Sequence, residues 1–317
     1  MHLVHHLDDL PAPLTRAVVA IGNFDGVHRG HQQVIEVAKR RAVDLGAPTA
    51  VLSFEPHPRQ LFQPDAPPFR LTPFRIRARL IEALGVDLHA VMTFDQVFAA
   101  QTAETFIERI LVDGFAARHV VIGFDFCFGK NRQGNAETLN GFGDHYGFGV
   151  TVVTQASDEA GGAYSSTRIR EHLRAGDMRA AAALLGRSWE IEGRVQHGDK
   201  RGRELGYPTA NIGMADYLRP AFGVYAIQAA VDRGNTGQLT WIDGVANLGV
   251  RPMFETPTPL LEVHLFDFRG DLYGQHVRVR LVERLRGEAK FDSLDQLITQ
   301  MNEDSARARA ILSVPVG

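Results

Sequence analysis

Five short apolar runs alternate with amphipathic stretches over about the first 186 residues of this 317-residue chain. The runs are rich in valine and lack polar alternation, as strands buried on both faces of a sheet require. The pattern predicts a Rossmann-like α/β domain, a parallel sheet with helices on both faces. The predicted strands are Ala17 to Ile21, Thr49 to Phe54, Leu88 to Phe94, His119 to Ile122 and Val150 to Val153, and helical spacing recurs at Ile35, Ala38, Ala42 and Leu45, at Ile76, Leu80, Ile81 and Leu84, and at Phe106, Ile107, Ile110 and Leu111.

The pattern changes after Gly186 to alternating strands punctuated by glycine, followed by one amphipathic window near the C-terminus. It predicts a small antiparallel β-barrel with a C-terminal helix. We therefore expect two domains, residues 1–186 and 187–317. The predicted barrel strands are Trp189 to Gln196, Gly223 to Val231, Leu239 to Val245, Leu260 to Phe268 and Val277 to Arg284, and the helix carries Leu294, Leu297, Ile298, Met301, Ala308, Ile311 and Leu312.

Bulk composition excludes several classes of function. Lysine and arginine total 34 against 37 aspartates and glutamates, a net charge of -3, so no general positive field exists for nucleic acid or an anionic membrane. We see no signal peptide and no apolar stretch of membrane-spanning length. The single cysteine, Cys127, fits a reducing compartment. We expect a cytoplasmic protein without an obligate protein partner.

Residues 22–31 read Gly-Asn-Phe-Asp-Gly-Val-His-Arg-Gly-His and join the first predicted strand to the first predicted helix. Such a turn directs backbone N–H groups and the positive end of the helix dipole at one point, where phosphates bind. His28 and His31 add side-chain donors, and Gly22, Gly26 and Gly30 let the backbone approach a ligand closely. The alternatives are a plain glycine-rich turn with solvated histidines, or a metal site that His57 completes.

The spacing of these histidines resembles the HxGH signature of the nucleotidyltransferase superfamily. The resemblance implies that His28 and His31 hydrogen-bond the reacting phosphates of a nucleoside triphosphate. It places Phe24 and Asp25, together with the three loop glycines, in the ATP site.

Further polar groups follow other predicted strands. His57 comes after the second strand and Asp125 after the fourth, and ligands of open parallel sheets bind at the carboxyl ends of strands. A third segment, Ser165-Ser166-Thr167-Arg168-Ile169-Arg170, opens a helical window with hydroxyl and guanidinium groups that suit phosphate oxygens. Taken alone, this segment also fits a simple helix N-cap with two solvated arginines.

Together with the HxGH loop, this segment resembles the adenylyltransferase module of bacterial bifunctional riboflavin kinase/FAD synthetases. The resemblance assigns Ser166, Thr167 and Arg170 to the triphosphate and puts Arg168 at a variable position. It implies that the FMN phosphate attacks the α-phosphorus of ATP in line and that pyrophosphate leaves. In that reaction His57 and Asp125 are expected near the flavin substrate.

The second half contains a glycine-rich basic segment that suits a polyphosphate, although it also fits a charged hairpin loop. After it, Pro208 presents Thr209 and Asn211, whose oxygens are suitable magnesium ligands when phosphates complete the coordination shell. The residues expected to contact phosphate here are Gly198, Lys200, Gly202, Arg203 and Pro208.

The run Gly206-Tyr207-Pro208-Thr209-Ala210-Asn211 resembles the flavokinase signature, and further matches follow in order. The resemblance implies that Glu262 is the general base for the flavin ribityl hydroxyl, and it assigns Tyr225 and Arg251 to flavin binding. Met253 departs from the threonine that usually follows Arg-Pro in this family.

The two resemblances together imply a bifunctional enzyme that phosphorylates riboflavin to FMN and adenylylates FMN to FAD, with ATP as co-substrate and Mg2+ as cofactor. One alternative is a nucleotidyltransferase for another phosphorylated acceptor, such as a cytidylyltransferase or a pantetheine-phosphate adenylyltransferase, fused to an unrelated barrel. Another is a flavin- or nucleotide-binding regulator without turnover.

Overall fold

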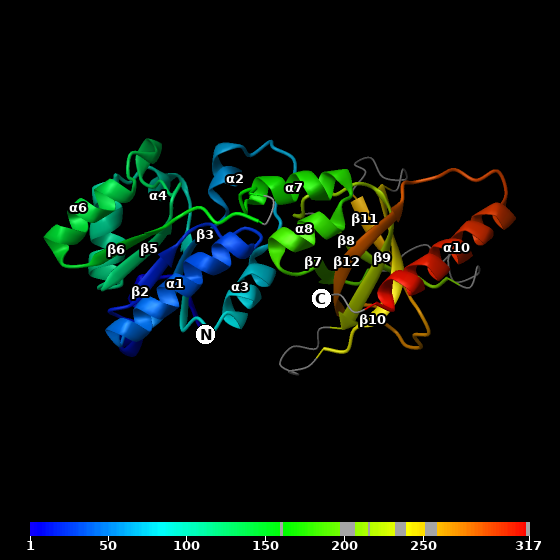
Figure 1. Cartoon of the computed structure of the whole chain (residues 1–317), viewed down its shortest axis with the longest axis horizontal. Coiled ribbons are helices and arrows are strands. Elements are labelled where there is room, and N and C mark those ends of the chain that lie inside the picture. Colours follow the sequence, from blue (N-terminus) through cyan, green and yellow to red (C-terminus); the bar gives the residue numbers. More distant parts are fainter. Residues whose placement is uncertain (159–160, 197–206, 215, 232–238, 251–258, 315–317) are drawn as a thin grey trace. The chain divides into compact units, whose positions relative to one another are not determined.

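The structure is a computed structural model, and it describes residues 1–158, 161–196, 207–214, 216–231, 239–250 and 259–314. Two compact units divide the chain: one comprises Met1–Pro67 and Thr72–Ser165, and the other comprises Pro68–Leu71 and Ser166–Gly317. Each unit is built on its own six-stranded sheet (Figure 1). The predicted fold class is confirmed, and the boundary predicted between residues 186 and 187 stays a prediction.

The first unit contains a parallel sheet with the strand order β1-β4-β3-β2-β5-β6. The short edge strand β1 was not predicted, because two of its three residues are exposed and it has no apolar run. The strands are β1 (His2–Val4), β2 (Val18–Ile21), β3 (Thr49–Glu55), β4 (Leu88–Thr93), β5 (His119–Gly123) and β6 (Gly149–Val153).

Helices cover both faces of this sheet, as the lack of polar alternation predicted. In β2, Val18 and Ala20 pack against α1 (Arg29–Leu45) and α3 (Phe74–Ala83), whereas Val19 and Ile21 face the helices of the opposite layer. That layer includes a π-helix, η3. The remaining elements of the unit are α2 (Pro58–Phe62), α4 (Gln96–Ala99), α5 (Ala103–Phe106), η3 (Ile107–Gly114), α6 (Ala136–Tyr146) and the 3-10 helices η1 (Leu7–Asp9), η2 (Ala12–Leu14) and η4 (Lys130–Arg132).

The second unit contains an antiparallel barrel with the strand order β7-β12-β9-β10-β11-β8. A bridge between Gln196 and Asn211 brings the two edge strands together, so the barrel is nearly closed. Strand β8 was not predicted, since only four residues form it. The strands are β7 (Trp189–Arg194), β8 (Ala210–Gly213), β9 (Gly223–Val231), β10 (Ile242–Val250), β11 (Pro259–Leu265) and β12 (His276–Arg286).

Within the described residues of the second unit, the helices are α7 (Ser166–Ala175), α8 (Met178–Leu185) and α10 (Leu294–Leu312). The predicted C-terminal helix α10 packs Ala308 and Leu312 against Val224 and Ala226 of β9. Among the described residues, no helix combines the length and the apolar character needed to cross a membrane.

Candidate active sites

The loop between β2 and α1 carries the two histidines at the start of the helix. His28 is the N-cap of α1, and its Nδ1 accepts the backbone N–H of His31 at 3.3 Å. In a neutral imidazole that accepts through Nδ1, the hydrogen lies on Nε2, so Nε2 is the donor. The two imidazole rings stack with 3.6 Å between centroids and 20° between planes. Both predicted phosphate ligands therefore lie together at a helix N-terminus.

The same loop has an unusual backbone. Phe24, Gly26 and Val27 have φ values of 50°, 92° and 41°. The left-handed region suits glycine but costs free energy for phenylalanine and most of all for a β-branched valine. Both of these side chains are buried, and the Phe24 ring meets the His31 ring edge-on at 5.3 Å. The packed core below the loop holds this conformation.

Crowding explains two of the loop glycines. A Cβ on Gly22 would lie 3.2 Å from the Phe24 ring, and a Cβ on Gly30 would lie 3.2 Å from the His28 ring. These glycines leave room for the side chains of their own loop, a packing role in addition to the ligand approach that the sequence suggested.

Thr72 attaches the loop to the segment that precedes α3. Its hydroxyl accepts the N–H of Gly26 at 2.8 Å, and its N–H and hydroxyl donate to Oδ1 of Asp25 at 3.0 and 3.3 Å. The Asp25 carboxylate is buried and makes these bonds inside the protein. Thr72 was not singled out from the sequence, because its partners lie more than 45 residues away and no local pattern marks it.

Arg77 of α3 is a second attachment that sequence reasoning missed. Its guanidinium bonds Oε2 of Glu55 at 2.7 Å and lies 3.4 Å from the carbonyl oxygens of Asn23 and Phe54. A signal did exist, since Arg77 falls on the same helical stripe as the buried Ile81.

The loops after β3 and β5 carry the residues predicted for the flavin substrate. His57 is the half-buried N-cap of α2, with Nδ1 accepting the N–H of Arg59 at 3.1 Å, and Asp125 is exposed just beyond β5. Strands β3, β2 and β5 are adjacent and parallel, so His28, His57 and Asp125 all follow strand ends at one edge of the sheet.

An aromatic cluster accompanies the His57 loop. The Phe94 ring lies 5.8 Å from the Phe54 ring and 6.0 Å from the Phe62 ring. Phe62 is 67% exposed, so the cluster reaches the surface at the end of α2. A partly exposed aromatic surface of this kind suits stacking of a planar ligand.

The third predicted segment opens α7 in the second unit. Ser166 is the first residue of this helix, and Thr167 is exposed. Arg170 donates from Nε to the carbonyl of Phe69 at 2.9 Å and lies over the Phe69 ring. Arg170 thus contacts its own unit, and the assignment of these three residues to the triphosphate stays a prediction.

In the barrel, three polar residues lie side by side across neighbouring strands. Glu262 of β11 pairs with Asn211 of β8 on one side and with Asn247 of β10 on the other. Directly paired residues have Cβ atoms about 4.5–5.5 Å apart on one face of a sheet. The register therefore brings together the predicted general base and one predicted magnesium ligand. Asn247 was not assigned a role from the sequence.

Thr209 precedes β8 in a segment held by ring and hydrogen-bond contacts. Nδ1 of His264 lies 3.0 Å from the carbonyl oxygen of Pro208, and the Tyr207 hydroxyl donates to Asn302 of α10 at 2.7 Å. The Tyr207 and His264 rings are 4.7 Å apart. The loop that presents Thr209 is therefore attached to both β11 and α10.

Other predicted residues of the second unit are not brought to this row. Tyr225 pairs with Ala246, so it projects from the opposite face to Glu262, and its buried hydroxyl donates to the carbonyl of Ala221. Burial raises the pKa of Tyr225 to about 12. Its assignment to flavin stays a prediction. Five further positions of interest, Gly198, Lys200, Gly202, Arg203 and Arg251, lie outside the described residues, as does Met253.

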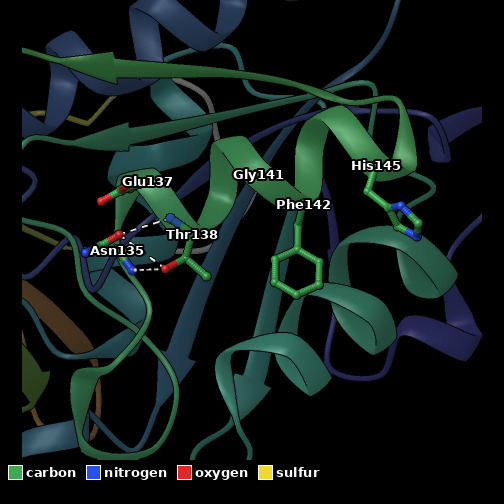
Figure 2. A pocket seen from close by; sticks show the side chains of 6 residues that line it. All are labelled: Asn135, Glu137, Thr138, Gly141, Phe142 and His145. Carbon is green, nitrogen blue, oxygen red and sulfur yellow. Dashed lines mark hydrogen bonds between the residues drawn. The ribbon is translucent and has the colours of Figure 1, made fainter.

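The described residues, which include His28, His31 and His57, contain no group of three or more His, Cys, Asp or Glu side chains placed to hold a metal ion. A surface hollow of about 520 Å³ lies along α6 (Figure 2). No residue predicted for either site lines it. The residues that do are Asn135, Glu137, Thr138, Gly141, Phe142 and His145.

Comparison with known proteins gives consistent matches to both halves. The FAD synthetase family model matches residues 10–168, and the riboflavin kinase family model matches residues 185–312. A bifunctional riboflavin kinase/FMN adenylyltransferase from Pseudomonas fluorescens is 43% identical over 98% of this chain and 98% of its own length. The protein of the same name from Escherichia coli K12 is 40% identical over 96% of this chain and 95% of its own length.

A solved structure also resembles the whole chain. It is a crystal structure described as a macrolide-efflux protein from Streptococcus pneumoniae, with a TM-score of 0.85, 33% identity, and coverage of 97% of this chain and 98% of the other. Its description differs from the names of the two relatives, but its fold matches along nearly the full length.

Proposed function

This chain belongs to the family of bifunctional riboflavin kinase/FMN adenylyltransferases, it converts riboflavin to FMN and FMN to FAD with ATP, and we propose that each reaction has its own site. We assign adenylyl transfer to residues 1–186 and the kinase reaction to residues 187–317. The single observation that carries the proposal is the pair of polar constellations, His28 with His31 in one unit and Asn211 with Glu262 in the other.

For adenylyl transfer we propose that His28, His31 and the N-terminus of α1 bind the triphosphate of ATP. A terminal phosphate oxygen of FMN attacks the α-phosphorus, the bond from the α-phosphorus to the bridging oxygen breaks, and pyrophosphate leaves. No covalent enzyme intermediate is needed, so positioning and stabilisation of negative charge carry catalysis. The stacked imidazoles and the helix dipole support this assignment.

We propose that FMN binds at the neighbouring loops, with His57 and Asp125 near it. The partly exposed Phe62 and the rings behind it support a planar acceptor on this side of the sheet edge. Phe24, Asp25 and the glycines Gly22, Gly26 and Gly30 shape the ATP loop, and Ser166, Thr167 and Arg170 bind further triphosphate oxygens.

For the kinase reaction we propose that the Glu262 carboxylate accepts the proton of the riboflavin 5′-hydroxyl while the hydroxyl oxygen attacks the γ-phosphorus of ATP and ADP leaves. Asn211 and Thr209 offer an amide oxygen and a hydroxyl, donor types that fit Mg2+ bound to a nucleotide. When bound, Mg2+ supplies charge neutralisation for the phosphates. Pro208 with Gly198, Lys200, Gly202 and Arg203 is assigned to phosphate, and Tyr225 and Arg251 to flavin.

We place the enzyme in the cytoplasm. The single cysteine, Cys127, fits a reducing compartment. The enzyme also uses ATP as its co-substrate. Fractionation of cells that express the tagged full chain tests this proposal, with both activities expected in the soluble cytoplasmic fraction.

Product analysis of three proteins tests the site assignments. Wild type, His28→Ala and Glu262→Ala are each incubated with ATP and Mg2+ and either riboflavin or FMN, and flavins are separated by chromatography. We expect His28→Ala to form FMN but no FAD, and Glu262→Ala to form FAD only from supplied FMN. An unchanged FAD rate in folded His28→Ala, or an unchanged FMN rate in folded Glu262→Ala, refutes that residue's role.

A further inference from the structure

Arg77 is a charged residue in a buried position, and burial of its charge costs free energy. The side chain is fully buried in α3, on the stripe that faces the sheet. A buried guanidinium requires partners for its charge and for its N–H groups, since leaving either unpaired in the interior is strongly unfavourable. The partners that it has therefore indicate what it holds in place.

The hydrogen-bond partners named for Arg77 lie in two different segments of the first unit. One is the end of β3, where Arg77 bonds the Glu55 carboxylate at 2.7 Å and lies 3.4 Å from the Phe54 carbonyl oxygen. The other is the loop after β2, where it lies 3.4 Å from the carbonyl oxygen of Asn23. Glu55 stands two residues before His57, and Asn23 stands five residues before His28.

We propose that Arg77 is a positioning residue for adenylyl transfer, which holds the loop of His28 and the loop of His57 in a fixed mutual arrangement. This inference rests on the proposed site, in which the first loop binds the triphosphate and the second lies beside the FMN acceptor. Arg77 touches neither substrate. Its planar fork presents donors in fixed directions, so one rigid group sets the relation between two chain segments.

The relative position of the two loops matters for the rate of adenylyl transfer. Direct transfer requires the acceptor oxygen to lie near 3–3.5 Å from the α-phosphorus and in line with the leaving group, and a misplacement of about 1 Å costs about 100-fold in rate. Each loop has its own local contacts, such as those of Thr72 with Asp25 and of His57 with Gln60, so each substrate keeps its own binding loop when the link is lost.

The test compares Arg77→Lys and Arg77→Met in the full chain. Lysine keeps the charge opposite Glu55 but lacks the fork that reaches two loops, and methionine keeps the apolar stem only. We expect kcat for FAD formation to fall at least about tenfold in Arg77→Lys and about 100-fold in Arg77→Met. The KM for ATP and the KM for FMN stay within about threefold, and FMN formation from riboflavin does not change.

Three results separate this role from a structural one. If Arg77 only stabilised the fold, the melting temperature would fall and the kcat per folded molecule would not, which overturns the proposal. A loss confined to the KM for ATP also overturns it, because it shows that Arg77 serves one loop. If Arg77→Met does not fold, the kcat of Arg77→Lys decides alone, and a value within threefold of wild type overturns the proposal.

Two control proteins complete the experiment. Arg40→Met removes a cation from α1 whose side chain is 70% exposed, and its rates are expected to equal those of wild type. His28→Ala tests the proposed site itself. If His28→Ala retains FAD formation, the site assignment fails. If His28→Ala loses FAD formation while both Arg77 variants keep theirs, the site stands and the inference about Arg77 fails.

Discussion

The two candidate sites differ in how their side chains are held. In the first unit, His28 and His57 lie in loops beyond parallel strands, and each loop is fixed by a residue distant in sequence, Thr72 or Arg77. In the barrel, Asn211 and Glu262 lie within paired strands. Strand register alone sets their spacing there, whereas the loop site depends on tertiary attachments.

This difference follows from the two kinds of sheet. Parallel strands all end at one edge, so their loops can collect groups from several places in the chain, but a loop has no ladder to fix its shape. Antiparallel strands place paired side chains on one face with a fixed separation. We therefore expect the first site to be sensitive to changes at remote anchors, and the second to changes in register.

The largest effect is expected when the two sites are separated on different molecules. A mixture of His28→Ala and Glu262→Ala is incubated with riboflavin, ATP and Mg2+, and FAD is measured over time. Each protein alone lacks one step, with a loss of about 100-fold or more. The mixture should restore FAD formation to the order of the wild-type rate, because one protein supplies FMN and the other consumes it.

That result is informative only when each variant keeps its own partial reaction. If both partial reactions are intact and the mixture still fails to make FAD, the two sites do not exchange FMN through solution. FMN would then have to pass directly from one site to the other within a single molecule.

Acid should destabilise the first unit selectively. Burial lowers the pKa of His89 in β4 from 6.5 to about 3, with the positive charges of Arg77 and His5 as smaller causes. The folded state keeps the imidazole neutral, next to the Ser53 hydroxyl at 2.8 Å, while the unfolded chain binds a proton below pH 6.5. The contribution of the neutral His89 to the free energy of unfolding is therefore fully present above pH 6.5. It decreases as the pH falls towards 3, by up to about 5 kcal/mol.

Amide hydrogen exchange measures this loss, with β3 and β4 as reporters. His89→Leu removes the titrating group, so its stability should change much less between pH 7 and pH 4 than that of wild type. Equal pH dependence in the two proteins would show that His89 is not the cause.

Alkali should act on the barrel instead. Burial raises the pKa of Tyr225 from 10 to about 12. The unfolded chain loses this proton first, so the stability present below pH 10 decreases between pH 10 and pH 12, by up to about 3 kcal/mol. Both tryptophans, Trp189 and Trp241, belong to the second unit, so tryptophan fluorescence during denaturant unfolding reports on it. Tyr225→Phe should remove most of this pH dependence. If stability decreases with pH equally steeply in Tyr225→Phe and wild type, the Tyr225 hydroxyl is not the cause.

Sequence patterns predicted the central elements because buried strands and helices require runs or stripes of apolar residues. Strands β2 to β6 all coincide with predicted runs to within one or two residues, and α10 begins and ends at the predicted positions. The short edge strands β1 and β8 bury too little surface to leave such a signal. Strand β10 ends at Val250 rather than at the predicted Val245, because Asn247 and Gly249 interrupt the apolar pattern inside a paired strand.

The residues of the candidate sites also fall into two groups, those that a local sequence pattern indicates and those that it does not. His28, His31 and Glu262 were predicted because they belong to local motifs. Thr72 and Arg77 were not, since their role exists only after the chain brings them to a loop 46 to 54 residues away. A sequence without that contact information indicates candidate ligand-binding groups but not the residues that hold their loops in place.

The smallest expected effect tests the other loop anchor, Thr72. Thr72→Val keeps the shape of the side chain but removes the acceptor for Gly26 N–H and the donor to Asp25. The loop holds Phe24 and Val27 at positive φ, so a lost anchor favours relaxation of that backbone. Loss of one buried hydrogen bond is worth about 1–2 kcal/mol, which corresponds to about a tenfold lower rate of FAD formation. Thr72→Ser restores the hydroxyl and should recover most of the rate, while FMN formation stays constant in both variants; equal rates for the valine and serine variants would mean that the hydroxyl does not hold the loop.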